Sequence, residues 1–453
     1  MTATQMKDVL EKDATLYLDS NTLDGPEGPE IFYVEPVIPG LRAEKENPPP
    51  KSERNRRYLY GTDVFKLHSR PGAKKIIYLD FDGHDLTGTA WSPSAYLYAP
   101  ACDWDDNPSS FSETEKGYIE LIWSRVAEDY APFDVDVTTE LLSPDLITRS
   151  GSTDTIYGTR VVIAPGIAST VCGSRCGGVA YVGIYGQTSD YYKPALVFPD
   201  MLNRDVKSIA EAISHEVGHN LNLQHDGTSS TGYYQGQGTG ETGWAPIMGV
   251  GYYKNLVQWS KGEYTSANNL QDDLQVISGY IPYRTDDVGD TIAAARPLSL
   301  VNGAFSASGV IGKTGEKDVF SLAAGIGSVT AQITVANSPS TNLDALLELL
   351  NAAGTVLATS NPLDTLATGL LSYSVPSAGT YYLRVSGVGK GDPKSTGYSN
   401  YGSLGQYSIS GTAVSCNPTC PTPAPSPTPA PAPPPPPPPG TSLDTYTVDL
   451  MGA

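Results

Sequence analysis

Three histidines and a glutamate stand close together near the middle of the chain: His215, Glu216, His219 and His225. On a helix, positions four apart lie on one face, so His215 and His219 can offer ring nitrogens to one metal ion. Glu216 flanks that face, where a carboxylate is better placed as a general base toward water than as a third ligand. A bend after the helix would add His225 and leave a fourth position open, as in catalytic zinc sites.

A helix over these residues is supported by the preceding sequence. Asp205 can cap its start, and apolar residues recur at helical spacing on the side away from the histidines: Val206, Ile209, Ile213 and Val217. The alternative is a short helix whose histidines only satisfy hydrogen bonds in a core. Three of the five histidines of the chain fall in this one stretch, which favours the metal site.

The same residues resemble the metzincin pattern H-E-x-x-H-x-x-G-x-x-H with a downstream Met-turn. Met248 stands where the Met-turn would run beneath the metal, and the Asp after the third histidine is similar to the adamalysin or reprolysin branch. Asn222 departs from the pattern, because it replaces the Gly at the bend; positive φ is needed there, and Asn tolerates it. The resemblance implies a zinc endopeptidase with the three histidines as ligands and Glu216 as catalytic base.

Composition limits the class of protein. The 453 residues suffice for two or three domains, and the net charge of −20 argues against nucleic acid as a partner. Charged residues make up only 17% whereas Gly and Tyr are plentiful, which is typical of β-rich extracellular protein. No stretch reaches the roughly 20 apolar residues of a transmembrane helix. We expect a secreted protein, although the chain shows no recognisable signal peptide.

The cysteines are grouped in a way that bears on the compartment. Cys172 with Cys176, and Cys416 with Cys420, predict two short-loop disulfides, which fit an oxidising environment. Cys102 stands alone. The alternative is an intracellular chain with five free thiols.

The sequence divides into four segments. Residues 1–70 are polar and rich in proline, and they predict a prosegment that ends in the basic, cleavable stretch 51–57, or else a disordered tail. Residues 71–283 predict the metzincin-like catalytic domain, 285–412 a β-sandwich, and 413–453 a proline-rich linker and tail in extended polyproline II conformation. The expected fold class is therefore α+β, a mixed twisted sheet plus an active-site helix, followed by an all-β domain.

Local patterns place the elements of the catalytic domain. Lys75–Phe81 predicts a strand, Thr159–Ala164 predicts a strand buried on both faces, and Phe133–Thr139 predicts a half-buried strand. Ser112 with Glu115 forms a capping box at the start of a helix.

The segment just before the metal-binding helix, Gly177–Ile184, is strand-like. In the metzincin resemblance it corresponds to the edge strand that pairs antiparallel with an extended substrate, whereas an interior strand is the alternative. The irregular run Gly227–Gly243 predicts a surface loop over the cleft.

The β-sandwich segment resembles the bacterial pre-peptidase C-terminal domain. The resemblance is carried by Asp318-Val319-Phe320, Leu343-Asp344-Ala345-Leu346-Leu347 and Ala378-Gly379-Thr380-Tyr381-Tyr382. It implies a possible Ca²⁺ site, for which the candidates are Asp286, Asp287, Asp290 and Asp318. Solvated acidic turns are the alternative.

Together these features predict a zinc-dependent endopeptidase that acts on extracellular or cell-wall proteins. Its partners would be protein or peptide substrates, and the C-terminal modules suggest attachment to cell wall or matrix. Two other functions stay open: an extracellular matrix or adhesion protein whose zincin domain is catalytically silent, and a zinc hydrolase that cleaves a different bond.

Overall fold

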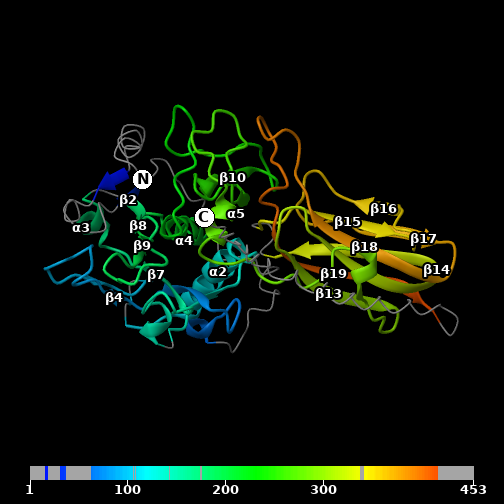
Figure 1. Cartoon of the computed structure of the whole chain (residues 1–453), viewed down its shortest axis with the longest axis horizontal. Coiled ribbons are helices and arrows are strands. Elements are labelled where there is room, and N and C mark those ends of the chain that lie inside the picture. Colours follow the sequence, from blue (N-terminus) through cyan, green and yellow to red (C-terminus); the bar gives the residue numbers. More distant parts are fainter. Residues whose placement is uncertain are drawn as a thin grey trace, which may run out of the picture.

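The computed structural model describes residues 63–416 except 106, 108, 142, 174–175 and 337–340. It also describes the backbone of two N-terminal strands, β1 (Leu16–Leu18) and β2 (Ile31–Pro36). The described chain forms two parts that lie end to end, one with helices and a mixed sheet and one built of strands (Figure 1). The rest of the predicted prosegment and the proline-rich tail fall outside the described residues.

A mixed sheet forms the centre of the first part. Its strands, in spatial order, are β1, β2, β8 (Cys176–Tyr181), β9 (Ala195–Val197), β7 (Tyr157–Ile163), β3 (Lys75–Asp80) and β6 (Val135–Thr138). The last four are parallel to one another, whereas β8 runs antiparallel to β9. The predicted strands are confirmed as strands. The half-buried character expected of Phe133–Thr139 is wrong, because all four residues of β6 are buried.

One buried residue of β6, Asp136, is acidic, and its burial has a local cause. Asp136 lies inside although it is charged, and its carboxylate accepts hydrogen bonds from the backbone N–H of Arg70 and pairs with His68. Such partners make the burial of a carboxylate tolerable. The alternation of apolar and acidic residues in Phe133–Thr139 therefore does not mean that the acidic side chains of β6 are exposed.

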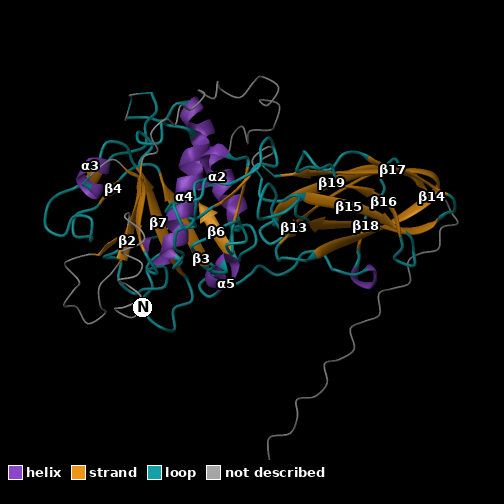
Figure 2. Cartoon of the chain, turned by 90° about the horizontal axis from the view of Figure 1, so that it is seen from above, coloured by secondary structure: helices purple, strands orange, loops and turns teal. Residues whose placement is uncertain are grey.

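Two helices pack against each other and position the histidine stretch. α2 (Glu113–Asp129) begins with the predicted capping box of Ser112 and Glu115, and α4 (Val206–Asn220) begins at the predicted cap, Asp205, whose side chain accepts a hydrogen bond from the N–H of Ser208. Figure 2 shows the two helices beside the strands. α4 contacts α2 as well as β8 and β9, so it is buried on nearly all sides and not on one face only.

Short elements complete the first part. They are β4 (His84–Asp85), β5 (Tyr98–Ala99), α3 (Ala168–Cys172), β10 (Trp244–Pro246), β11 (Leu256–Gln258) and α5 (Asp273–Ser278). β10, which ends directly before the turn at Met248, pairs in parallel with β11, which follows that turn. Among the described residues, no helix has both the length and the apolar character needed to cross a bilayer.

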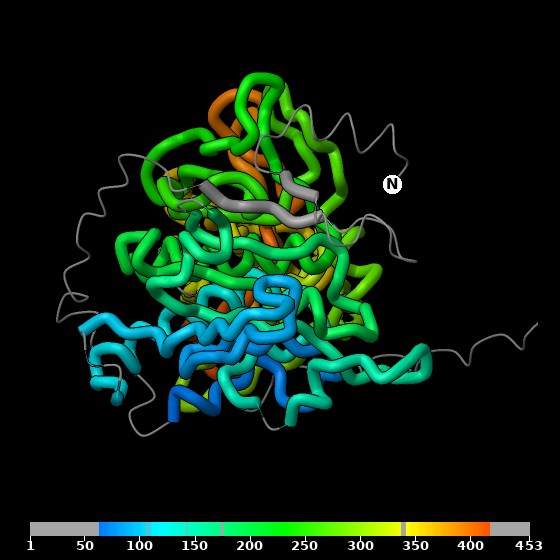
Figure 3. Tube along the Cα trace, turned by 90° about the vertical axis from the view of Figure 1, so that its left-hand side faces the viewer, coloured from blue at the N-terminus to red at the C-terminus, as the bar shows by residue number. Residues whose placement is uncertain are grey.

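The second part is one sandwich-like sheet, called here the C-terminal sheet. Its strands are β12 (Arg296–Pro297), β13 (Ala304–Ile311), β14 (Lys317–Val335), β15 (Ala345–Leu350), β16 (Val356–Ser360), β17 (Leu371–Val375), β18 (Gly379–Gly387) and β19 (Gly405–Ser415). β14 pairs with β18 over its first half and with β17 and β19 over its second half, so this one long strand connects all three of them in the sheet. Seen from the end that carries the mixed sheet, the C-terminal sheet lies behind it (Figure 3).

The two parts are joined by buried polar contacts. The carboxylate of Glu128, at the end of α2, accepts hydrogen bonds of 2.9 Å from the backbone and the side-chain amide of Gln406. The neighbouring Asp129 accepts one of 2.7 Å from the side chain of Asn342. Burial raises the pKa of Glu128 to about 7, although the bonds from Gln406 act in the opposite direction. An interface of this kind is specific, because separation would leave buried carboxylates without their partners.

Candidate metal centre

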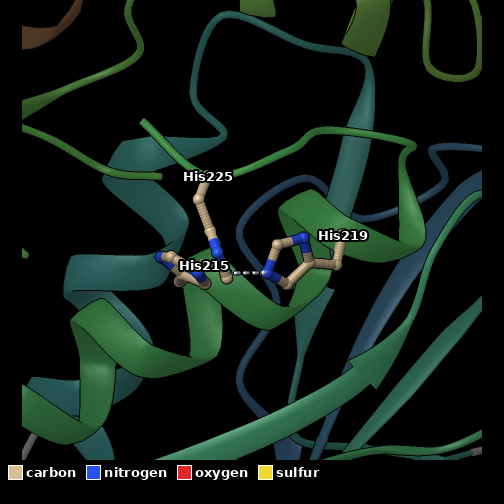
Figure 4. A group of neighbouring side chains, drawn as sticks. All are labelled: His215, His219 and His225. Atoms are coloured by element: carbon tan, nitrogen blue, oxygen red, sulfur yellow. Dashed lines mark hydrogen bonds between the residues drawn. The ribbon is translucent and has the colours of Figure 1, made fainter. Parts of the chain in front are cut away.

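The three predicted ligands come together in the structure. His215 and His219 project from α4, His225 reaches toward them from the chain beyond the helix, and the three rings face one another (Figure 4). Their candidate ligand atoms lie within 4.8 Å of one another, and Nε2 of His219 stands 3.1 Å from Nε2 of His225. Each histidine is at most 4% exposed.

The ring orientations suit a metal ion. Nδ1 of His215 lies 2.9 Å from the carbonyl of Ile247, and Nδ1 of His219 lies 2.9 Å from the carbonyl of Leu223. A carbonyl can only accept, so in the neutral rings Nδ1 carries the proton and Nε2 presents its lone pair. This arrangement of a backbone partner behind the ligand is common around zinc. Two tetrahedral nitrogen ligands at zinc lie roughly 3.3 Å apart, close to the spacing found here.

The bend after α4 depends on Asn222. Its φ is 73°, so the predicted left-handed conformation is confirmed. The N–H of Asn222 donates to the carbonyl of His219, and that of Leu223 donates to the carbonyl of Gly218, which ends the helix and reverses the chain. This reversal carries His225 back to the other two histidines.

Met248 is fully buried and packs against α4 between the two helical histidines. A Cβ placed on Gly218 would overlap its sulfur, so the helix needs a glycine at this contact. The carbonyl of Met248 accepts a 2.7 Å hydrogen bond from the N–H of Asp226. The turn therefore contacts the helix at Gly218 and the segment that bears His225 at Asp226.

Glu216 is fully buried and lies against β8 of the mixed sheet. A Cβ added to Gly178, in β8, would overlap the carboxylate of Glu216. Gly178 therefore makes room for this side chain beside the histidines. The sequence reasoning missed this role, although two consecutive glycines inside a strand are a recognisable sign of close approach.

Tyr233 is a second residue that the sequence reasoning missed. Its ring centroid lies 4.3 Å from that of His225 and 6.3 Å from that of His215. It belongs to the predicted Gly227–Gly243 loop, which is irregular in the structure. The only signal in the sequence was a pair of tyrosines in a Gly-rich run soon after the third histidine.

The predicted edge strand is occupied on its outer side. β8 ends at Tyr181, before the predicted Ile184, and β2 pairs with it antiparallel, with Val34 opposite Val179 and Pro36 opposite Cys176. The register shifts between these two pairs, at Glu35, which places Glu35 opposite the Gly177–Gly178 step. In the described chain β8 therefore lies between β2 and β9, as the interior-strand alternative predicts, and it is the edge only of the part of the sheet that residues 63–416 form.

The acidic candidates in the C-terminal sheet are only partly brought together. Asp286 and Asp318 gather with Glu316, and their ligand oxygens lie within 4.8 Å of one another. Asp287 and Asp290 are not part of this group, and one carboxylate oxygen of each accepts a hydrogen bond, from the backbone N–H of Val310 and of Lys317 respectively. Glu316, which no prediction included, belongs to the group.

Crowding of carboxylates in this group changes their protonation. Burial, together with neighbouring carboxylates, raises the pKa of Asp318 to about 8 and that of Glu316 to about 7. Asp318 is fully buried; one of its oxygens accepts a 2.5 Å bond from the hydroxyl of Tyr407, and the other has no hydrogen-bond partner among the described residues. A buried carboxylate oxygen in this state fits a cation better than it fits an apolar core.

One predicted disulfide is present. Cys172 and Cys176 are bonded and join α3 to the start of β8. Cys102 is a buried free thiol. The second predicted pair cannot be followed, because Cys420 lies outside the described residues.

No protein-family model and no curated protein matches this chain. Solved structures similar to parts of it include the pre-peptidase C-terminal domain of collagenase from Bacillus anthracis, with 13% identity over 28% of this chain and 98% of that one, at a TM-score of 0.18. The g-type lysozyme inhibitor PliG of Aeromonas hydrophila matches at 14% identity over 26% and 94% of the two chains, with a TM-score of 0.20.

A longer match is OgpA from Akkermansia muciniphila, with 9% identity over 74% of this chain and 92% of that one, and a TM-score of 0.19. At these identities and TM-scores, none of the similarities carries a conclusion about fold or activity. The coarse result is a mixed α/β part with a histidine triad and a sandwich-like sheet that has a distant pre-peptidase C-terminal neighbour.

Proposed function

We propose that this protein is a secreted, zinc-dependent endopeptidase of metzincin type. The observation that carries the proposal is the convergence of His215, His219 and His225, with two Nδ1 atoms turned to backbone carbonyls and Glu216 buried beside them. The disulfide between Cys172 and Cys176 supports an oxidising, extracellular location.

The residues divide the chemistry between them. His215, His219 and His225 would hold the metal, and a zinc ion there supplies Lewis-acid polarisation of the scissile carbonyl and of the attacking water. Glu216 takes a proton from that water as the new C–O bond forms, and then passes it to the amide nitrogen as the C–N bond breaks. The protons balance: one of the two protons of the water reaches the leaving amine through Glu216, and the other stays on the new carboxylic acid, which then loses it to solvent.

Substrate would bind as an extended strand along β8. β8 is the edge strand of the mixed sheet within residues 63–416, and it passes Glu216 at Gly178. β2 already pairs with this edge antiparallel, which supports the proposal that the N-terminal segment is an inhibitory prosegment.

Glu216→Gln tests the proposal. This variant should bind one zinc per chain with unchanged affinity and cleave a quenched protein substrate about 10²- to 10⁴-fold more slowly, because only the proton transfer is removed. A chelator should abolish cleavage by the parent protein. Undiminished cleavage by Glu216→Gln, or cleavage that survives chelation, would remove the proposed mechanism.

A second proposal concerns Asp286, Glu316 and Asp318, which we assign to a calcium site in the C-terminal sheet. The unpartnered, buried oxygen of Asp318 supports it. The ligands are all oxygens of carboxylates, which suit a hard cation.

A further inference from the structure

The Gly227–Gly243 loop, which carries Tyr233, is tied to the C-terminal sheet at several points. The carboxylate of Glu241 accepts a 3.0 Å hydrogen bond from the N–H of Leu366, and the hydroxyl of Thr242 accepts one of 2.7 Å from the ammonium group of Lys390. These partners lie more than a hundred residues away along the chain. The loop beside the histidines is therefore shaped by the other part of the molecule.

Gln237 makes two further hydrogen bonds between this loop and the C-terminal part. Its side-chain N–H₂ donates to the carbonyls of Gly397 and, at 2.7 Å, Pro393, both in the C-terminal part. Its side-chain oxygen accepts a 2.9 Å bond from the hydroxyl of Tyr234. Gln237 is only 9% exposed, so both donors and the acceptor are satisfied inside the protein.

The contact continues from Gln237 to the histidines. The ring of Tyr234 stacks on Tyr264 with centroids 4.1 Å apart and planes 5° apart, and its N–H donates to the carbonyl of Asp226 at 2.7 Å. The next residue toward the N-terminus, Tyr233, lies with its ring against His225. Fixing Tyr234 at both its backbone and its hydroxyl leaves Tyr233 little freedom to leave the third histidine.

We infer that Gln237 is a positioning residue through which the C-terminal sheet holds Tyr233 against His225. On this inference the C-terminal sheet belongs to the framework of the metal centre and is not a module that merely follows it. The inference rests on the proposed function for its catalytic consequence. The structural part of the inference, that Gln237 keeps the loop beside the histidines ordered, can be tested in the metal-free protein.

Gln258 offers a matched control. It is also a buried glutamine, 1% exposed, and its side chain donates to the carbonyl of Asn342 at 2.5 Å and accepts from the indole N–H of Trp244 at 3.0 Å. It thus joins the two parts with the same kinds of hydrogen bond, but from β11 and not from the loop. Gln237→Leu and Gln258→Leu should lower the thermal unfolding midpoint of the full chain by similar amounts.

The first measurement is amide hydrogen exchange in the metal-free full-length protein. Gln237→Leu should speed exchange of residues 231–236 about tenfold, whereas Gln258→Leu should leave those amides as in the parent. If Gln237→Leu does not fold, Gln237→Glu keeps the acceptor for Tyr234 and loses the two donors, and it should show the same change.

The second measurement is cleavage of a quenched peptide by the zinc-loaded proteins. Gln237→Leu should lower kcat about tenfold with one zinc still bound, because the third ligand is less well fixed, and Gln258→Leu should stay within about twofold of the parent. Equal behaviour of the two variants in both measurements would overturn the inference. If the parent itself cleaves nothing, the proposed function fails, and the exchange measurement still decides whether Gln237 orders the loop.

Discussion

Gly178 and Glu216 are in direct contact, the backbone of β8 against the carboxylate of the proposed catalytic base, with no room for a Cβ between them. Gly178→Ala should therefore push the carboxylate from its position and lower kcat/KM about 10- to 100-fold, since small displacements of a reacting group are costly. Zinc content should not change. Steady-state cleavage with metal analysis checks this.

The adjacent glycine provides the control for that variant. A Cβ on Gly177 would meet the end of the Leu202 side chain at 2.9 Å, and a flexible leucine can move aside. Gly177→Ala should accordingly keep most of the activity. An equal loss in both alanine variants would show that the strand, and not the space beside Glu216, had been disturbed.

Disruption of the β2 contact should activate the full-length protein. Val34→Pro removes a backbone N–H and breaks the pairing of β2 with β8, so the edge becomes available and cleavage of a quenched peptide should rise about tenfold or more. Thr22→Pro, which lies outside both β1 and β2, should not have this effect. No gain in activity for Val34→Pro would mean that β2 does not block substrate.

Calcium should stabilise the protein through Asp318. At a concentration of about 100 times the dissociation constant, the expected gain in unfolding free energy is about 2.7 kcal/mol. Asp318→Asn should abolish this gain, and without calcium it should be at least as stable as the parent above about pH 8, because the crowded carboxylate is gone.

Asp290→Asn is the matched control for the calcium experiment. Asp290 was a predicted ligand, but its carboxylate accepts a hydrogen bond from Lys317, and an asparagine oxygen can do the same. Thermal unfolding of this variant should still respond to calcium. Loss of the response there, with its retention in Asp318→Asn, would place the cation elsewhere.

Two histidines outside the metal centre should affect stability with opposite pH dependence. Burial lowers the pKa of His68, but its hydrogen bonds with Glu140 and Asp136 together raise the pKa by more than burial lowers it, so the net shift is upward. The folded state thus binds this proton more tightly, and the gain is complete below the unfolded pKa of about 6.5 and lost as pH rises through the folded pKa. In urea unfolding, His68→Gln should cost more at about pH 5.5 than at about pH 8.5.

His84 provides the opposite case. Burial, assisted by the charge of Arg160, lowers its pKa to about 4. Its contribution is present above about pH 6.5 and is lost as pH falls toward 4, because the unfolded chain takes up the proton first. The parent should therefore lose stability over this interval and His84→Gln should lose less. The same pH trend in both variants would contradict these assignments.

The sequence allowed the local features of the metal centre to be predicted. The cap at Asp205, the helix that it begins and the left-handed bend at Asn222 follow from side-chain and backbone preferences within a few residues. Convergence of the three histidines then follows from helix pitch and one reversal of the chain.

The contacts that surround the centre could not be predicted in this way. Gln237 meets Pro393 across 156 positions, and nothing in the loop marks that partner. Burial of α4 on nearly all sides and the pairing of β2 with β8 also depend on how distant segments pack. The same holds for the acidic group of the C-terminal sheet. Asp290 is a suitable residue type, but its carboxylate accepts a hydrogen bond from a backbone N–H, whereas Glu316 lies beside Asp286 and Asp318.

The carboxylates at the end of α2 bear on the order in which this protein can fold during synthesis. The hydrogen-bond partner of Asp129 is Asn342, which is synthesised 213 residues later, and that of Glu128 is Gln406, which is synthesised 278 residues later. Until both are made, two carboxylates that are buried in the finished protein stay hydrated, and the helix beside α4 cannot reach its final packing. We therefore expect the part that bears the histidines to reach its final packing only after β19 has left the ribosome, so the proposed proteolytic activity would begin only then.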